Sequence, residues 1–382
     1  MQLVNFPKDK LNKCFEVLQS RASLSGNMQP VHYLDLGTAC VKVVNYSSEF
    51  ASHIKKQLDY ILTDTASKNI DATLVCWKET NFSELFGIVD ESLNPKTNLR
   101  FRVEMLVKQS RGQKGLFPAS VRVFGDENTK KQPLIDINGK QQIITAFDKR
   151  SNTYYYSAAN LEPEEFIKQG HIFVSVLNRI LKTDTTALVH AAVVGLENFG
   201  VLFCARGQRG KSTLAVLAML EGFDYVSDDY LVLNRDETGN LYSYPIYSII
   251  TLSPRMYNEL YDKLSGARFV SNNSRKDKYV LNISAYHDQF RRKYPISVCM
   301  FPQITTDKFP SIVPTERGRA VTQLIHSTIR QMNDNYDIKT VRKLMNFVKD
   351  FEFYQINLCS DIQANVDVLR EFCEKHSLLK AA

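Results

Sequence analysis

Absences narrow the class of protein before any motif is considered. No apolar run in the 382 residues approaches the length of about 18 that indicates a membrane-spanning helix. The amino terminus lacks the charged-then-apolar pattern of a secretory signal, and the sequence contains no internal repeat or low-complexity tract. We therefore expect a protein of the cytoplasm that has no membrane as a partner.

Cysteine is scarce, and its spacing excludes two further classes. The seven cysteines are scattered, odd in number and without C-x-x-C spacing, which is typical of neither a disulfide framework nor a zinc site. We expect reduced, buried thiols.

The net charge of +7 is modest for this length and fits anionic small ligands. A nucleic-acid partner would need a denser basic surface, so none is expected.

One glycine-rich stretch dominates what is present. It follows the apolar run Val201–Cys204 and leads into the helix formers Thr213–Leu220. This strand, loop and helix order is that of a Walker A phosphate-binding loop, or P-loop. The candidate nucleotide-binding residues are consecutive: Arg206, Gly207, Gln208, Arg209, Gly210, Lys211, Ser212 and Thr213.

The chemistry of such a loop assigns roles to two of these residues. Backbone N–H groups surround the phosphates, Lys211 reaches the β- and γ-phosphates, and Ser212 binds Mg²⁺. The sequence departs from the G-x-x-x-x-G-K-[ST] pattern at its first position, where Ala205 replaces glycine, although Gly207 restores some backbone freedom. We predict ATP and Mg²⁺ as ligands, and the sequence leaves the preference for ATP over GTP open.

Paired carboxylates end the next predicted strand, Phe223–Asp229, which returns directly after the helix. Such a strand can lie parallel to the first, so that Asp228 and Asp229 stand at its carboxyl end beside the phosphates. One carboxylate would hold Mg²⁺, and the other would take the proton from an attacking hydroxyl. Without the phosphate loop, the same pair would be typical of a solvated turn.

A single histidine lies within the apolar run Ala187–Gly195, which predicts one buried strand. The short turn Leu196–Gly200 predicts a hairpin into the strand before the phosphate loop, so that His190 stands on a neighbouring strand. There a histidine can tune an aspartate or shuttle its proton. It can equally be a satisfied core residue, and both interpretations stay open.

Three segments resemble the catalytic core of the HPr kinase/phosphorylase-like proteins, which are relatives of phosphoenolpyruvate carboxykinases. They are Val189–Ala192, Arg206–Thr213 and Val226–Leu233. A looser resemblance extends to the end of the chain. The long downstream signature by which HPr kinases grip HPr and run the reverse phosphorolysis is missing. The chain therefore resembles divergent family members found beside peptide-modification genes.

The resemblance implies a fold and a set of roles. The fold is an α/β P-loop core with a mixed sheet. Lys211 would bind the β- and γ-phosphates, and Ser212 and Asp229 would bind the magnesium. Asp228 would be the general base, oriented by His190. These roles make Asp228, His190 and Lys211 the expected catalytic residues.

Length and patterning predict two domains, residues 1–183 and 184–382. In the first, two amphipathic helices and a hairpin precede mostly alternating segments between residues 72 and 158. This predicts an α+β domain with an antiparallel sheet, which serves either acceptor recognition or homo-oligomerisation. A helix from Pro163 to Thr183 would bridge the two domains.

Basic residues of the second domain are candidates for stabilising the transition state of phosphoryl transfer. They lie in two polar segments, at Arg275, Lys276 and Lys278, and at Arg317 and Arg319. Basic loops are also common on the surface of a basic protein. The sequence does not choose among these five side chains.

Together these features predict a kinase that transfers the γ-phosphoryl group of ATP to a hydroxyl. From the resemblance, the acceptor would be a serine of a peptide or small protein. Two alternatives stay open: a small-molecule kinase that acts on free serine, a sugar or another metabolite, and a non-catalytic nucleotide-binding module. Ala205 favours the module, whereas His190 with the two aspartates favours a kinase.

Overall fold

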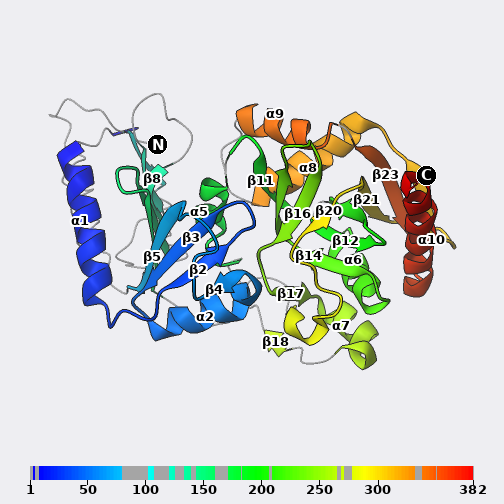
Figure 1. Ribbon diagram of the computed structural model, residues 1–382, viewed down its shortest axis with the longest axis horizontal. Coiled ribbons are helices and arrows are strands. Elements are labelled where there is room, and N and C mark those ends of the chain that lie inside the picture. Colours follow the sequence, from blue (N-terminus) through cyan, green and yellow to red (C-terminus); the bar gives the residue numbers. More distant parts are fainter. Residues whose placement is uncertain are drawn as a thin grey trace, which may run out of the picture. The chain divides into compact units, whose positions relative to one another are not determined.

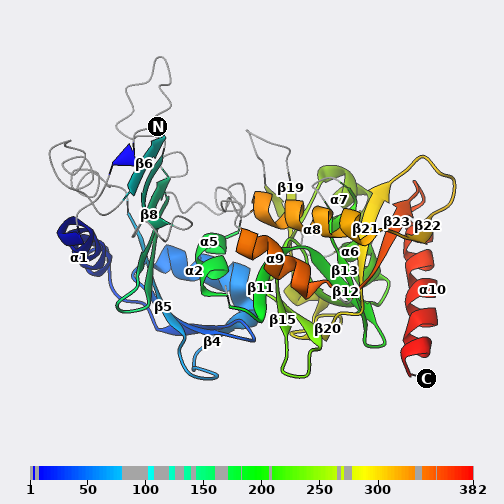
Figure 2. The ribbon, with the colours of Figure 1, turned by 90° about the horizontal axis from the view of Figure 1, so that it is seen from above.

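A computed structural model shows a mixed α/β protein whose sheets combine parallel and antiparallel strands (Figures 1 and 2). The residues that it describes are 3–4, 8–79, 102–106, 120–124, 133–138, 143–159, 171–181, 183–205, 209–264, 268–270, 278–331, 338–349 and 351–381. The chain forms two compact units. The first comprises Met1–Asp35, Cys40–Lys55 and Leu62–Val176, and the second comprises Leu36–Ala39, Lys56–Ile61 and Leu177–Ala382.

The first unit is built around a ten-stranded sheet with the order β1-β6-β7-β8-β9-β10-β5-β3-β2-β4. Its strands are Leu3–Val4 (β1), His32–Asp35 (β2), Cys40–Asn45 (β3), Leu62–Thr63 (β4), Ala72–Lys78 (β5), Arg102–Leu106 (β6), Ser120–Phe124 (β7), Pro133–Asn138 (β8), Ile143–Asp148 (β9) and Thr153–Ala158 (β10). The helices that accompany it are Lys8–Leu24 (α1), Ser48–Leu58 (α2) and Val174–Ile180 (α5). Leu11, Phe15 and Leu18 recur at helical spacing on α1 and pack in one core with Trp77 of β5.

The prediction of an antiparallel sheet is wrong for the middle of this sheet. Strand β5 pairs in parallel with both β3 and β10, while the sheet's other described ladders are antiparallel. The connection from β3 to β5 contains α2, and a crossover with a helix joins parallel strands, whereas an antiparallel pair needs only a hairpin. Of the predicted helix from Pro163 to Thr183, the structure describes α5, and residues 160–170 lie outside the described part.

The second unit contains three sheets within its described residues. The six-stranded sheet has the order β14-β12-β13-β21-β23-β22. Its strands are Asp224–Ser227 (β14), Ala192–Leu196 (β12), Phe199–Phe203 (β13), Val298–Ile304 (β21), Glu352–Leu358 (β23) and Ser311–Pro314 (β22). The four-stranded sheet joins Thr186–His190 (β11), Tyr230–Arg235 (β15), Leu241–Pro245 (β16) and Tyr294–Pro295 (β20), and the three-stranded sheet joins Ile249–Leu252 (β17), Lys278–Asn282 (β19) and Arg268–Val270 (β18).

Helices cover both faces of the six-stranded sheet. They are Lys211–Leu220 (α6), Arg317–Gln331 (α8), Ile338–Phe347 (α9) and Ile362–Ala381 (α10), whereas Pro254–Leu260 (α7) lies against β19 of the three-stranded sheet. Alternate residues of a strand point to opposite faces. Val194 and Phe203 therefore join a core with α6 and α10, whereas Val193 and Leu202 join the core beneath α8 and α9. Figures 1 and 2 both show α8 and α9 side by side.

Several strands of this sheet end at the same edge. Strand β13 runs parallel to β21, and β21 runs parallel to β23. Strand β14 points the same way as β13, because both are antiparallel to β12. The carboxyl ends of β14, β13, β21 and β23 therefore meet at one edge, which is where open α/β sheets bind ligands.

Strand β14 runs in the same direction as β13, as expected, and β12 lies between them. One prediction about these strands needs correction. The single strand predicted over Ala187–Gly195 is two strands in different sheets: β11 ends at His190, and β12 begins at Ala192. The chain changes sheet at Ala191, whose backbone N–H donates to the carbonyl of Asp229 (3.1 Å). The apolar run could not reveal this change, because both strands are buried.

All seven cysteines are free and buried, as predicted. In the part of the chain that the structure describes, no helix combines the length and the apolar character needed to cross a membrane.

Candidate functional site

The predicted phosphate loop leads into α6 at the edge of the sheet where β13, β21 and β23 end. Gly210 precedes the helix with φ +92°, a left-handed conformation that glycine adopts without strain. Lys211, Ser212 and Thr213 form the first turn, whose free N–H groups and positive dipole end favour an anion. Arg209 is exposed. Three predicted phosphate-binding residues, at positions 206–208, lie outside the described residues.

Replacing Gly210 with alanine should lower nucleotide affinity about tenfold or more, which corresponds to roughly 1.4 kcal/mol per factor of ten. A Cβ at Gly210 would stand 2.5 Å from Leu358 Cδ1 and would occupy a left-handed conformation, so the loop must change shape. Calorimetric titration with ATP measures the effect. Gly239→Ala is the matched control, because Gly239 has φ +89° with no described atom within 4 Å of an added Cβ. Equal affinity in the two variants would contradict the prediction.

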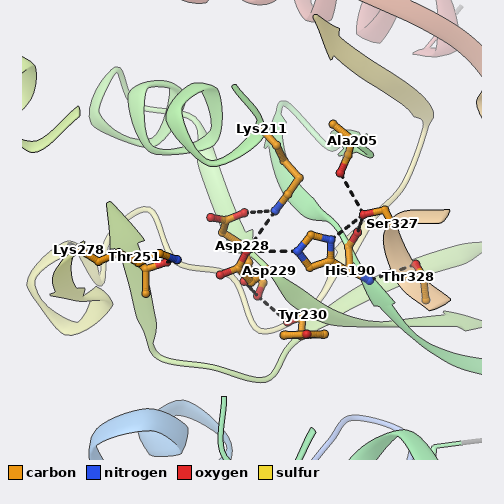
Figure 3. A network of polar contacts seen from close by, with 11 residues as sticks. His190, Ala205, Lys211, Asp228, Asp229, Tyr230, Thr251, Lys278, Ser327 and Thr328 are labelled. Atoms are coloured by element: carbon orange, nitrogen blue, oxygen red, sulfur yellow. Dashed lines mark hydrogen bonds and ion pairs between the residues drawn. The ribbon is translucent and has the colours of Figure 1, made fainter. Parts of the chain in front are cut away.

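Lys211 is buried, and its amino group contacts both aspartates (Figure 3). It forms an ion pair with Asp228 Oδ1, and Nζ lies 3.6 Å from Asp229 Oδ1. Burial alone would lower the pKa of Lys211, but the Asp228 and Asp229 carboxylates outweigh it and raise the pKa. The lysine is therefore a buried cation, held by the two carboxylates.

Asp228 has one oxygen that its ion pair does not use. The side chain is 1 % exposed, and Oδ2 has no hydrogen-bond partner among the described residues. A buried carboxylate oxygen without a partner is costly, and most buried polar atoms in folded proteins are paired. Such an atom at the end of the strand beside the phosphate loop is available to a proton or a cation.

Asp229 reaches the cluster through an unusual backbone conformation. Its φ is +68°, in the left-handed region that residues with a Cβ seldom adopt. Strain of this kind concentrates at functional sites. The carbonyl of Asp229 accepts the N–H of Ala191, so the turn is fixed against the start of β12. As a result, two consecutive aspartates both lie within reach of Lys211.

His190, the last residue of β11, lies on the other side of Asp229. Its Nε2 is 3.4 Å from Asp229 Oδ1, and its Nδ1 is 2.6 Å from Ser327 Oγ. Burial lowers the pKa of His190, and the hydrogen bond with Asp229 opposes this only in part. The resemblance implied that the histidine orients Asp228. In the structure the aspartate that it contacts is Asp229, and Asp228 is held by Lys211.

Helix α8 contributes two buried hydroxyl groups that the sequence analysis missed. Ser327 Oγ donates toward the carbonyls of His190 and Ala205, each at 3.0 Å, and Thr328 Oγ1 accepts the backbone N–H of His190 at 3.2 Å. Ser327 thus joins the histidine to the first residue of the phosphate loop (Figure 3). A signal was present: the apolar stripe that includes Leu324 continues into these hydroxyl residues, which are buried on the same helix.

Ser327→Ala should destabilise the protein by about 1–3 kcal/mol, because the buried carbonyls of His190 and Ala205 lose a donor. Urea unfolding measures this change. Thr322→Ala is the matched comparison on the same helix, because Thr322 is exposed and its hydroxyl donates within its own turn, to the carbonyl of Gly318 (2.8 Å). If the two variants unfolded at the same urea concentration, Ser327 would have no special role.

The structure leaves the choice among the predicted cations untested. Lys278 lies at the start of β19, where its Nζ donates to Thr251 Oγ1 (3.2 Å). Arg317 is exposed at the first turn of α8, and Arg319 belongs to the same turn, without a described side chain. The remaining two candidates, at positions 275 and 276, lie outside the described residues.

The residues present fit a magnesium ion that is completed by a substrate. The described residues contain no group of three or more His, Cys, Asp or Glu side chains that could hold a metal alone. Mg²⁺, however, usually binds one or two carboxylates together with water and phosphate oxygens. Ser212, half-buried in the first turn of α6, and Asp229 supply such a partial set, and the unpartnered Asp228 Oδ2 adds an oxygen nearby.

Comparisons with known proteins add little to this geometry. No protein-family model matches the chain. No curated protein matches its sequence. Among solved structures, the HPr(Ser) kinase/phosphatase from Coxiella burnetii is a weak neighbour, with a TM-score of 0.26 and 12% identity. The alignment covers 51% of this chain and 97% of that one, and a likeness at this level carries no argument about activity.

Proposed function

We propose that the protein is an ATP- and Mg²⁺-dependent kinase that transfers the γ-phosphoryl group to a hydroxyl. The observation that carries the proposal is the cluster at the start of α6, where Lys211 contacts two consecutive aspartates and His190 contacts the second of them. A module that only binds phosphate needs the loop and the lysine. It does not need a buried carboxylate oxygen without a partner beside them.

Nucleotide binding would begin with an exchange of partners at Lys211. In the structure, the ammonium group is paired with Asp228. The β- and γ-phosphates carry more charge than one carboxylate and would take over the lysine, as P-loop lysines do. This exchange frees both oxygens of Asp228 for the acceptor.

Phosphoryl transfer then needs a proton acceptor. Asp228 would take the proton of the acceptor hydroxyl while the hydroxyl oxygen approaches the γ-phosphorus in line. A bond forms between that oxygen and the phosphorus, the bond to the bridging oxygen breaks, and the electron pair leaves on ADP. Ser212 and Asp229 would hold Mg²⁺, which neutralises phosphate charge when bound. His190 would keep Asp229 in place through its contact at 3.4 Å.

The acceptor class rests on the motif resemblance. It favours a serine of a peptide or small protein, with a small-molecule hydroxyl as the second candidate. Under this proposal the domain of residues 184–382 carries the chemistry. The domain of residues 1–183 recognises the acceptor or forms a homo-oligomer.

Mass spectrometry of candidate acceptors tests the function. The full-length protein is incubated with ATP, with and without Mg²⁺, and with serine-containing peptides, free serine and sugars. We expect a gain of one phosphoryl group on a member of one acceptor class, only when Mg²⁺ is present. ATP binding without ADP formation or transfer to any acceptor would instead identify a nucleotide-binding module.

A further inference from the structure

A pocket of about 110 Å³ in the second unit adjoins both ends of the predicted phosphate loop. Cys204, Ala205 and Arg209 form its wall on the loop side, and Phe301 and Pro302 of β21 also line it. It opens at the edge where β13, β21 and β23 end, a usual place for ligands in α/β sheets. None of the roles proposed above uses this pocket.

The polar lining of the pocket is unusual in kind. Three glutamines, Gln303, Gln323 and Gln355, line it together with Thr315, and the Gln355 amide donates to Asn357 Oδ1 (2.7 Å). Among the described residues, the lining contains one cation, Arg209, and no carboxylate. An amide presents a donor and an acceptor side by side, which matches the edge of a purine base, and the Phe301 ring supplies apolar surface. A pocket that bound inorganic phosphate would instead be expected to contain several cations.

The position of the pocket indicates whether it lies on the acceptor side or on the nucleoside side of the transferred phosphorus. Along the sheet the order is β14-β12-β13-β21-β23, so the aspartates after β14 and the pocket over β21 lie on opposite sides of the loop strand β13. In-line transfer places the acceptor and the leaving nucleotide on opposite sides of the phosphorus. Asp228, the proposed base, must be on the acceptor side. The pocket is therefore on the nucleoside side.

The distance between the two sites is suitable. Three strand spacings separate β14 from β21, or roughly 14 Å at about 4.8 Å each. About ten covalent bonds join the γ-phosphorus to the base, and an extended chain advances roughly 1.2 Å per bond, or about 12 Å in all. A nucleoside triphosphate with its γ-phosphate beside the aspartates can thus place its base in the pocket.

We infer that this pocket holds the purine base of the nucleoside triphosphate and that Gln303 and Gln323 hydrogen-bond its edge. The inference rests on the proposed function. It adds a binding site for the base, which the phosphate loop does not contact. The loop binds phosphate alone, whereas the amides distinguish a nucleotide from any other polyphosphate.

Inorganic tripolyphosphate separates the affinity that the phosphates contribute from the affinity that the base contributes, because it carries the phosphates without a base. Gln303→Met and Gln323→Met keep side-chain length and remove the amide. Calorimetric titration of full-length protein should show ATP binding weakened about tenfold in each variant, with tripolyphosphate binding unchanged. Gln363→Met is the matched control, because Gln363 is an exposed glutamine of α10 in the same unit and should leave both affinities unchanged.

Other results overturn the inference. Parallel losses of ATP and tripolyphosphate affinity would mean that the variants disturb the loop. An unchanged ATP affinity with a raised KM for the acceptor would assign the pocket to the acceptor. Wild-type protein that binds ATP no more tightly than tripolyphosphate would exclude a base site and leave the kinase proposal standing. Binding of neither ligand would remove the kinase proposal as well.

Discussion

Replacing Asp228 with asparagine should lower the rate of phosphoryl transfer by about 10²- to 10⁴-fold, the usual contribution of a general base. Asparagine keeps the size of the side chain and cannot take the proton of the acceptor. ATP affinity should be unchanged or higher, because a negative charge beside the phosphates is removed. The turnover number and the dissociation constant of ATP, measured on the same preparation, test both parts.

Two further variants show whether the effect belongs to this carboxylate. Asp224→Asn changes an aspartate at the opposite end of β14, where Asp224 Oδ1 pairs with Arg291 Nη2 (2.6 Å), and should leave turnover unchanged. Asp229→Asn should raise the Mg²⁺ concentration needed for half-maximal rate. If Asp229→Asn abolished transfer at saturating Mg²⁺ while Asp228→Asn kept most of it, the two roles would be reversed.

Lys211→Met should destabilise the fold by about 3–5 kcal/mol and abolish nucleotide binding. Methionine fills the space of the lysine, but it leaves the Asp228 and Asp229 carboxylates close together, with the former buried, and without the cation that both now contact. Urea unfolding measures the stability change, and titration with ATP measures the loss of binding.

A second lysine provides the control for this experiment. Lys263 pairs with Glu221 at 2.6 Å on the surface, and exposed pairs of this kind contribute about 0–1 kcal/mol. Lys263→Met should therefore change stability little. The double variant Lys211→Met with Asp228→Asn also removes the unpaired Asp228 carboxylate. Part of the lost stability should therefore return. A double variant less stable than Lys211→Met would contradict the explanation by unpaired charge.

Local patterns in the sequence were sufficient to predict most of the elements. The mostly alternating segments between residues 72 and 158 predicted strands such as β10, and the turn at Leu196–Gly200 predicted the hairpin of β12 and β13. Glycine followed by helix formers predicted the start of α6. In each case the information lies within about ten residues of the element, where side-chain period and turn chemistry act.

Pairing between distant segments was not predictable in the same way. Ser327 lies 137 residues from His190 in the sequence, and nothing near either residue indicates the contact. The insertion of β12 between β13 and β14 and the parallel pairing of β5 likewise depend on partners elsewhere in the chain. The sequence thus supplied the candidate residues of the site, whereas the assignment of each partner, Asp229 to His190 and Asp228 to Lys211, needed the fold.

The backbone of Asp229 has a consequence for engineering. A left-handed residue with a Cβ costs roughly 1–2 kcal/mol, whereas glycine adopts the conformation without this cost. A library of variants selected by heat alone would therefore enrich glycine at this position. The enriched variants would be more thermostable but would lack the proposed magnesium ligand. A selection for thermostability must therefore be coupled to an assay of turnover.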